Sequence, residues 1–138
     1  MSSFTSVSKK SRVRRKTQGR LEKGGFLALP HSIIRSQQFG RLNPWALKLL
    51  LELASAYRGS NNGDLSAAFS MLRLRGWKSP GTLAGAKKEL VEAGWIVTTR
   101  QGGRNRCSLY AVTWWSIDEC SGKTEVSAEK TARNDWRK

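Results

Sequence analysis

The sequence predicts an α+β domain in which a three-helix core is followed by a C-terminal β-hairpin. Two segments, 44–57 and 79–93, begin with a capping residue and a proline and continue with apolar residues at helical spacing. Residues 95–115 are rich in β-branched and aromatic side chains on both sides of a glycine-containing stretch, which is typical of a hairpin. A shorter apolar pattern at 67–74 predicts the remaining helix of the core.

Length and charge predict one domain with two tails. The chain of 138 residues is 38% hydrophobic, which is enough for one modest core, and we expect that core within residues 26–119. Residues 1–25 hold 8 basic residues, 1 acidic residue and scarcely any apolar ones, which predicts a disordered basic arm. Residues 120–138 are polar and of mixed charge, which predicts a flexible C-terminal tail.

The first part of the domain is expected to lead into one long helix. An apolar entry at 26–30 precedes a segment at 31–36 that is long enough for one or two helical turns. The first long helix is predicted at 44–57, because its leucines recur at helical spacing after the cap-and-proline signal. Residues 59–63 predict a turn, and residues 64–66 a very short strand.

The second and third helices are expected to be joined by a short turn. The short helix at 67–74 ends at Gly76, and the helix at 79–93 has Ser79 as its N-cap and Gly94 at its end. One face of this third helix is expected to be buried and the opposite face exposed. The first face holds Leu83, Ala86, Leu90 and Ala93, and the second holds Gly81, Gly85, Lys88 and Glu92.

Strands are expected at 95–100 and 107–115, which flank the glycine-rich tip of a hairpin. Three arginines, Arg100, Arg104 and Arg106, are expected to cluster at this tip. A cluster of cations on an exposed turn is either a solvated loop or a contact for phosphate groups.

The capped helix at 79–93 and its exit Glu-Leu-Val-Glu-Ala-Gly-Trp-Ile-Val resemble the recognition helix and first wing strand of winged helix-turn-helix DNA-binding proteins. The order of elements over residues 43–115 is similar to that family throughout. The run at 109–120 and the lead-in Phe-Leu-Ala-Leu-Pro resemble small helix-turn-helix proteins of phages, plasmids and integrative elements. The resemblance implies a winged helix-turn-helix fold.

A net charge of +15, from 25 basic and 10 acidic residues, favours a polyanionic partner. The resemblance implies that this partner is double-stranded DNA and that the protein regulates transcription in a mobile genetic element, with helix 79–93 in the major groove and a basic wing. The helix departs from the family pattern because Gly81, Ala84 and Gly85 face outwards. The residues expected at the DNA are Lys78, Ser79, Thr82, Gly85, Lys88, Arg100, Arg104, Asn105 and Arg106.

Several other functions stay open from the residues alone. A plasmid or phage replication initiator and an RNA- or ribosome-binding winged-helix protein would have a similar basic surface. A protein adaptor could use Trp77, Trp115 or Trp136 as exposed contacts. A homodimer on a palindromic site is also open. An enzyme is not expected, since the sequence offers no nucleophile with a nearby base, no paired carboxylates and no phosphate-binding glycine loop.

One histidine and two cysteines, Cys107 and Cys120, are too few for a metal cluster, so no metal or cofactor is expected. The sequence shows no secretory signal and no apolar run of the length that spans a membrane. We therefore expect a protein of the bacterial cytoplasm or nucleoid with free thiols, and neither a membrane nor a small molecule as its partner.

Overall fold

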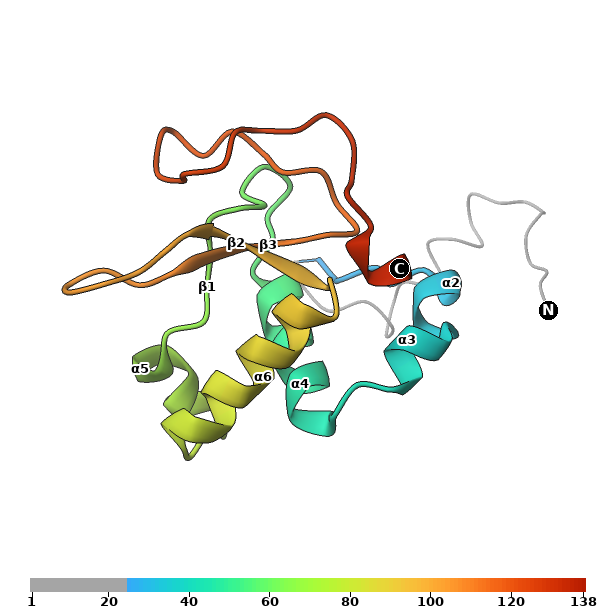
Figure 1. Cartoon of the computed structure of the whole chain (residues 1–138), viewed down its shortest axis with the longest axis horizontal. Helices are drawn as coiled ribbons and strands as arrows, with labels where there is room; N and C mark the ends of the chain where they lie inside the picture. Colours follow the sequence, from blue (N-terminus) through green and yellow to red (C-terminus); the bar gives the residue numbers. More distant parts are fainter. Residues whose placement is uncertain (1–24) are drawn as a thin grey trace.

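The computed structural model describes residues 25–138, so the basic arm predicted for residues 1–25 lies, apart from Gly25, outside the described residues. Within residues 25–138 the chain forms short and long helices and a three-stranded antiparallel sheet, which confirms the α+β class (Figure 1). The elements in chain order are α2 (His31–Ile34), α3 (Gln37–Gly40), α4 (Pro44–Ser55), β1 (Leu65–Ser66), α5 (Phe69–Leu72), η1 (Arg73–Arg75), α6 (Pro80–Glu92), β2 (Ile96–Arg100), β3 (Leu109–Val112) and η2 (Asp135–Arg137).

The two long helices form the centre of the core. Both begin as predicted, because Asn43 accepts a hydrogen bond from the Trp45 amide and Ser79 accepts one from the Thr82 amide, each in front of a proline. Helix α4 packs against α6, and their facing apolar side chains are almost fully buried. A fully buried leucine contributes about 1.5–3 kcal/mol, so these positions dominate the stability of the domain. They are Leu49, Leu50, Leu53, Leu83 and Leu90.

One position of the predicted apolar face of α6 is exposed. Leu83, Ala86 and Leu90 are buried, but Ala93 is not. The reason is that the helix ends at Glu92 and Gly94 adopts a φ of +83°, which turns the chain so that Trp95 enters the core instead.

Two short helical segments differ from their prediction. The helix predicted at 67–74 is divided into α5 and the 3-10 turn η1, and Gly76 ends it with a φ of +94°. Helix α3 was not predicted at all. It forms because the Ser36 hydroxyl accepts the Phe39 amide at 3.1 Å, and the Phe39 ring then meets Trp95 edge-on at 5.9 Å.

The sheet has the strand order β1-β3-β2, with β3 in the centre. Strand β3 is shorter than the predicted 107–115, and β2 pairs with it out of regular register between Thr98 and Arg100. This irregularity buries Thr99, whose hydroxyl donates to the Gly63 carbonyl at 2.6 Å. The hydrogen bond connects β2 to the loop before β1.

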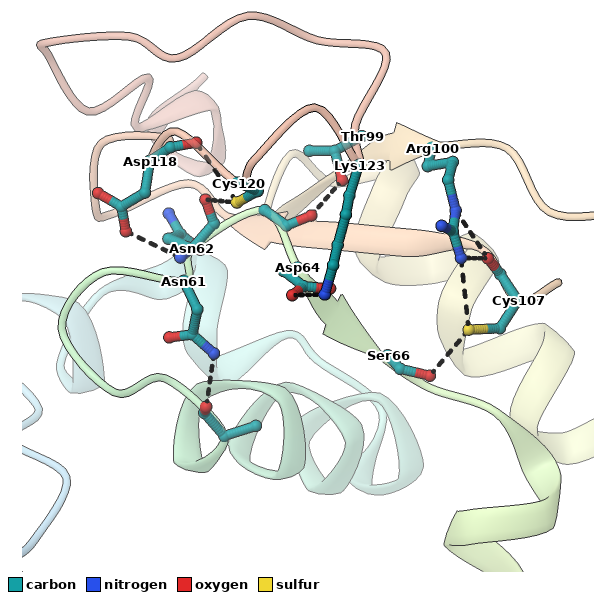
Figure 2. Close-up of polar contacts among 12 residues, drawn as sticks. Asn61, Asn62, Asp64, Ser66, Thr99, Arg100, Cys107, Asp118, Cys120 and Lys123 are labelled. Atoms are coloured by element: carbon teal, nitrogen blue, oxygen red, sulfur yellow. Dashed lines mark hydrogen bonds and ion pairs between the residues drawn. The ribbon is translucent and has the colours of Figure 1, made fainter.

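A fully buried asparagine extends the short β1–β3 pairing. The Asn62 side chain accepts from the Val112 amide at 2.8 Å and donates to the Val112 carbonyl at 3.0 Å, as a paired strand residue would. The side-chain amide also donates to the carbonyl of Ser116. The backbone amide of Asn62 donates to the Asp118 carboxylate (Figure 2). Asn62 therefore fixes the chain where it leaves the sheet, a role that the predicted turn at 59–63 did not reveal.

The flexible tail predicted for residues 120–138 is instead packed against the sheet. Figure 1 shows this segment on one side of the sheet and helices α4 and α6 on the other. Backbone hydrogen bonds connect it to the sheet and its exit, including Glu125 to Thr99 and Asn134 to Thr113. Trp136 is only 3% exposed and stacks on Trp95 at 4.9 Å. Polar composition did not reveal this packing, because Trp136 is the one aromatic side chain of the segment and it is buried.

The tryptophans proposed as exposed adaptor contacts are not exposed. Trp77 and Trp136 are buried, and the half-buried Trp115 stacks on Tyr57 at 4.1 Å. These side chains belong to the core and its edge, so the adaptor alternative loses the residues on which it rested.

Candidate nucleic-acid interface

The outward face of α6 carries small side chains in its first half. Gly81, Ala84 and Gly85 are exposed, and Lys88 follows one turn later. A Cβ atom placed on Gly85 would have nothing within 4 Å, so neither packing nor backbone conformation requires glycine there. The face is therefore a stripe of nearly bare helix that another molecule could approach closely.

The start of α6 is open to solvent. Lys78, Ser79 and Gly81 are exposed, whereas Thr82 is partly covered. The Ser79 hydroxyl oxygen serves as the N-cap acceptor at 3.3 Å from the Thr82 amide. The positive end of the helix dipole lies here, which favours an anion near the first turn.

The segment before α6 adds exposed apolar and basic side chains. Leu74 is 78% exposed and Met71 is 50% exposed, next to the exposed Arg73. Leu74 belongs to the apolar pattern that predicts a helix at 67–74, but the chain tightens into η1 after Leu72, and Leu74 is exposed. Arg75 is not free, since it pairs with Glu52 of α4 at 2.6 Å and so ties η1 to the core.

The three hairpin arginines do not form the predicted cluster. Arg100 is half-buried, and its guanidinium donates to the Cys107 carbonyl at 2.8 and 3.3 Å (Figure 2). The Cys107 carbonyl lies outside the β2–β3 ladder, and Arg100 satisfies it across the hairpin, just beyond the last paired residues. Only Arg104 and Arg106 are near the turn, where Gly103 and Arg106 form an isolated bridge.

The turn itself is short and exposed. Arg104 and Asn105 occupy its two central positions, and Asn105 adopts a φ of +61°, which asparagine tolerates better than most residues. In Figure 1 the hairpin tip extends beyond the helices, on the same side of the view as α5. Arg106 turns back from the tip, since it donates to the Gln101 carbonyl at 3.3 Å and to Glu125 at 3.0 Å.

Some cations of the described residues form ion pairs, and others have no acidic partner. Acidic side chains engage Lys48, Arg75, Arg106, Lys123, Arg133 and Lys138. Eight exposed cations form no ion pair or hydrogen bond through their side chains with any residue of 25–138. Arg35, Arg58, Lys130 and Arg137 lie elsewhere on the surface, and the other four lie in η1, around α6 or at the hairpin turn. Those four are Arg73, Lys78, Lys88 and Arg104.

The remaining charges on α6 are distributed unevenly. Lys87 is half-buried, and burial lowers the pKa of its ammonium group while the interaction with Cys107 opposes this shift. Glu89 accepts the Asn43 amide at 2.9 Å and so caps α4. Because Glu92 is exposed near the end of the helix, the first half of the outward face is the more attractive half for an anion.

Of the nine residues predicted at the interface, the structure places seven on exposed surface near α6 and the hairpin turn, and one of the seven is engaged in an ion pair. Thr82 is partly covered, Arg100 is used within the hairpin, and Arg106 is exposed but paired. Those fully available are Lys78, Ser79, Gly85, Lys88, Arg104 and Asn105. Sequence reasoning missed Arg73, which the helical pattern left unassigned, and Glu125, which lies in the segment predicted to be a tail.

The described residues hold neither a group of metal-ligating side chains nor a helix that could span a membrane. Within residues 25–138, no three His, Cys, Asp or Glu side chains come together as they would to hold a metal ion. Across the same residues, no helix has the length and apolarity needed to cross a membrane. Comparison of the chain with protein-family models, curated proteins and solved structures finds no match.

Proposed function

We propose that this chain is a double-stranded DNA-binding protein with a winged helix-turn-helix architecture. In this proposal α5 and α6 are the helix-turn-helix, α6 lies in the major groove, and the β2–β3 hairpin is the wing. The observation that carries it is the nearly bare outward stripe of α6, with free cations before it, beside it and at the hairpin turn. The transcription of a mobile element remains the proposed target of regulation, and replication initiation the alternative.

The stripe fits a groove better than it fits open solvent. A glycine in the middle of an exposed helix costs about 1 kcal/mol relative to alanine, and Gly85 occupies such a position in α6, whereas Gly81 lies in the first turn. The major groove of B-form DNA is about 12 Å wide and admits a helix, and small outward residues let the helix backbone come close to the bases. Specific contacts would then come from Ser79, Thr82 and Lys88.

In this proposal, four cations without an acidic partner supply the part of the affinity that does not depend on DNA sequence. Arg73, Lys78, Lys88 and Arg104 have no acidic partner among residues 25–138 and can each neutralise a phosphate. Four such contacts predict a salt dependence of log affinity with a slope of about −3.6. The helix N-terminus adds a further favourable field for a phosphate group.

The same geometry favours DNA over double-stranded RNA. The major groove of an A-form RNA duplex is deep and narrow, so a helix cannot enter it, and RNA is read through its shallow minor groove or single-stranded loops. The stripe on α6 presents neither aromatic platforms for unstacked bases nor a broad surface. Exposed aromatic side chains among residues 25–138 are Phe26 and Trp45, neither of which belongs to α6.

The experiment is a selection of bound sequences from a random duplex pool with the full chain. The selected duplex is then compared, at one salt concentration, with an RNA duplex of the same sequence and with a scrambled DNA duplex. We expect a defined site, at least about tenfold tighter than the scrambled duplex, and weak RNA binding. A palindromic site would support a two-fold homodimer. Equal affinity for all three nucleic acids would reject the proposal that α6 reads a groove.

A further inference from the structure

The C-terminal segment places a carboxylate on one of the two arginines near the hairpin turn. The Glu125 carboxylate accepts from the Arg106 guanidinium at 3.0 Å and from the backbone amide of Gln101 at 3.3 Å. Arg106 also donates to the Gln101 carbonyl, so the three residues form a closed set of contacts beside the hairpin. Arg104, two residues away, has no such partner among residues 25–138.

Backbone contacts hold Glu125 in this place. Its amide donates to the Thr99 carbonyl of β2 at 2.6 Å, directly before the hairpin loop. Two residues earlier, Lys123 pairs with Asp64 at 2.9 Å, and Cys120 is buried next to Asn62. The segment is therefore fixed along β2, and the carboxylate is presented to Arg106 by the fold rather than by a freely moving side chain.

The Arg106–Glu125 pair contributes little to stability. The side chains are 48% and 57% exposed, and exposed ion pairs are weak because water screens both charges. A guanidinium group binds a carboxylate and a phosphate with the same donor geometry. The Glu125 carboxylate thus occupies the position that a phosphate group would take on Arg106, and a polyanion can displace it.

We propose that Glu125 is an internal competitor for the phosphate that Arg106 would otherwise bind, so that the C-terminal segment lowers the affinity of the hairpin for DNA. This inference rests on the proposed DNA-binding function. It makes the segment 120–138 an autoinhibitory element, and Glu125 the residue through which it acts. Release of Glu125 would add one phosphate contact to those available from Arg73, Lys78, Lys88 and Arg104.

The test is Glu125→Gln in the full chain, measured against the duplex selected for the parent. Glutamine keeps an acceptor for the Gln101 amide but removes the competing charge. We expect affinity to rise between about twofold and fivefold, the range of an exposed ion pair, and the salt slope to steepen by about one unit. Thermal unfolding should change little, which shows that the segment stays docked.

The matched control is Glu129→Gln, which removes one charge from the same segment but from a carboxylate that pairs with Arg133 at 2.7 Å. It should leave affinity within about twofold of the parent, because Glu129 engages Arg133 and not a hairpin arginine. In an Arg106→Ala background, Glu125→Gln should give no gain. A gain of the same size there, or from the control, would overturn the inference because Glu125 would then act only as a general charge.

The outcomes separate the inference from the function on which it rests. Specific binding by the parent with no gain in Glu125→Gln would reject the competitor role and leave the DNA-binding proposal standing. Failure of the parent to bind any duplex in the selection would reject the proposed function, and the inference with it. A loss of affinity in Glu125→Gln would reject competition in favour of a positioning role for the carboxylate.

Discussion

Trp136→Ala is the change that most clearly separates a docked C-terminal segment from a flexible tail. The indole is 3% exposed and stacks on Trp95 with an interplanar angle of 7°. Its ring nitrogen donates to the Asn134 side chain at 3.2 Å, and the Asn134 amide donates to the Thr113 carbonyl. Removal of the ring therefore leaves a cavity against Trp95 and weakens the attachment of residues 134–138.

The magnitude follows from the buried area. A tryptophan buries about 150–250 Å², which at about 25 cal/mol per Å² corresponds to about 4–6 kcal/mol as an upper bound. Truncation of a buried tryptophan to alanine typically costs about 3–5 kcal/mol. We expect the low end, about 3 kcal/mol, because the segment can detach while α4, α6 and the sheet stay folded, which limits the loss to its docking free energy.

Urea unfolding followed by far-UV circular dichroism measures this loss. The unfolding midpoint should fall by at least about 1 M. Arg137→Ala is the control, because its guanidinium lies 4.5 Å over the same ring but is exposed, and it should cost less than about 1 kcal/mol. If Trp136→Ala unfolds at the same urea concentration as the parent, the segment does not dock and the tail is flexible after all.

Two further substitutions test the same architecture by the same unfolding measurement. Gly94→Ala should destabilise the protein by at least about 1 kcal/mol, since its Cβ would lie 2.6 Å from the Asp135 carbonyl oxygen and its φ is +83°; an unchanged midpoint would show that this close approach is absent. Asn62→Ala should cost about 3 kcal/mol or more, because it leaves the buried Val112 amide and several carbonyls without a partner. A cost below about 1 kcal/mol would mean that water replaces the amide group.

The helices could be predicted because their signals are local. Asn43-Pro44 and Ser79-Pro80 mark the two starts with cap-forming side chains, and the leucines of α4 and α6 repeat at the spacing of one helix face. Gly76 and Gly94 end their helical segments with positive φ values. Such features depend on a few neighbouring residues, so they can be read from the chain.

The sheet and the tail could not be predicted in detail because their contacts are distant in sequence. Asn62 bonds to Val112, fifty residues away, and nothing near Asn62 distinguishes it from any other turn asparagine. Trp136 meets Trp95 only after the chain has crossed the sheet. Polar composition predicts a free tail, but composition does not show where one large aromatic side chain packs.

The candidate interface was predicted in part for the same reason. The periodicity of α6 placed Gly81, Gly85 and Lys88 outwards, as the structure does. The partners of Arg100 and Arg106 depend on how the hairpin closes and where the C-terminal segment runs, so the sequence alone does not show that both arginines are engaged.

The proposal that α6 enters a groove is tested most directly by Gly85→Leu at the selected duplex. Its Cβ has nothing within 4 Å, and leucine favours helices, so the fold should be kept or slightly stabilised. A bulky side chain there would hold the helix away from the bases. We expect specific affinity to fall at least about a hundredfold, to the level of a scrambled duplex, while Ser55→Leu on the exposed end of α4 binds like the parent. Equal affinity of Gly85→Leu and the parent would contradict the account.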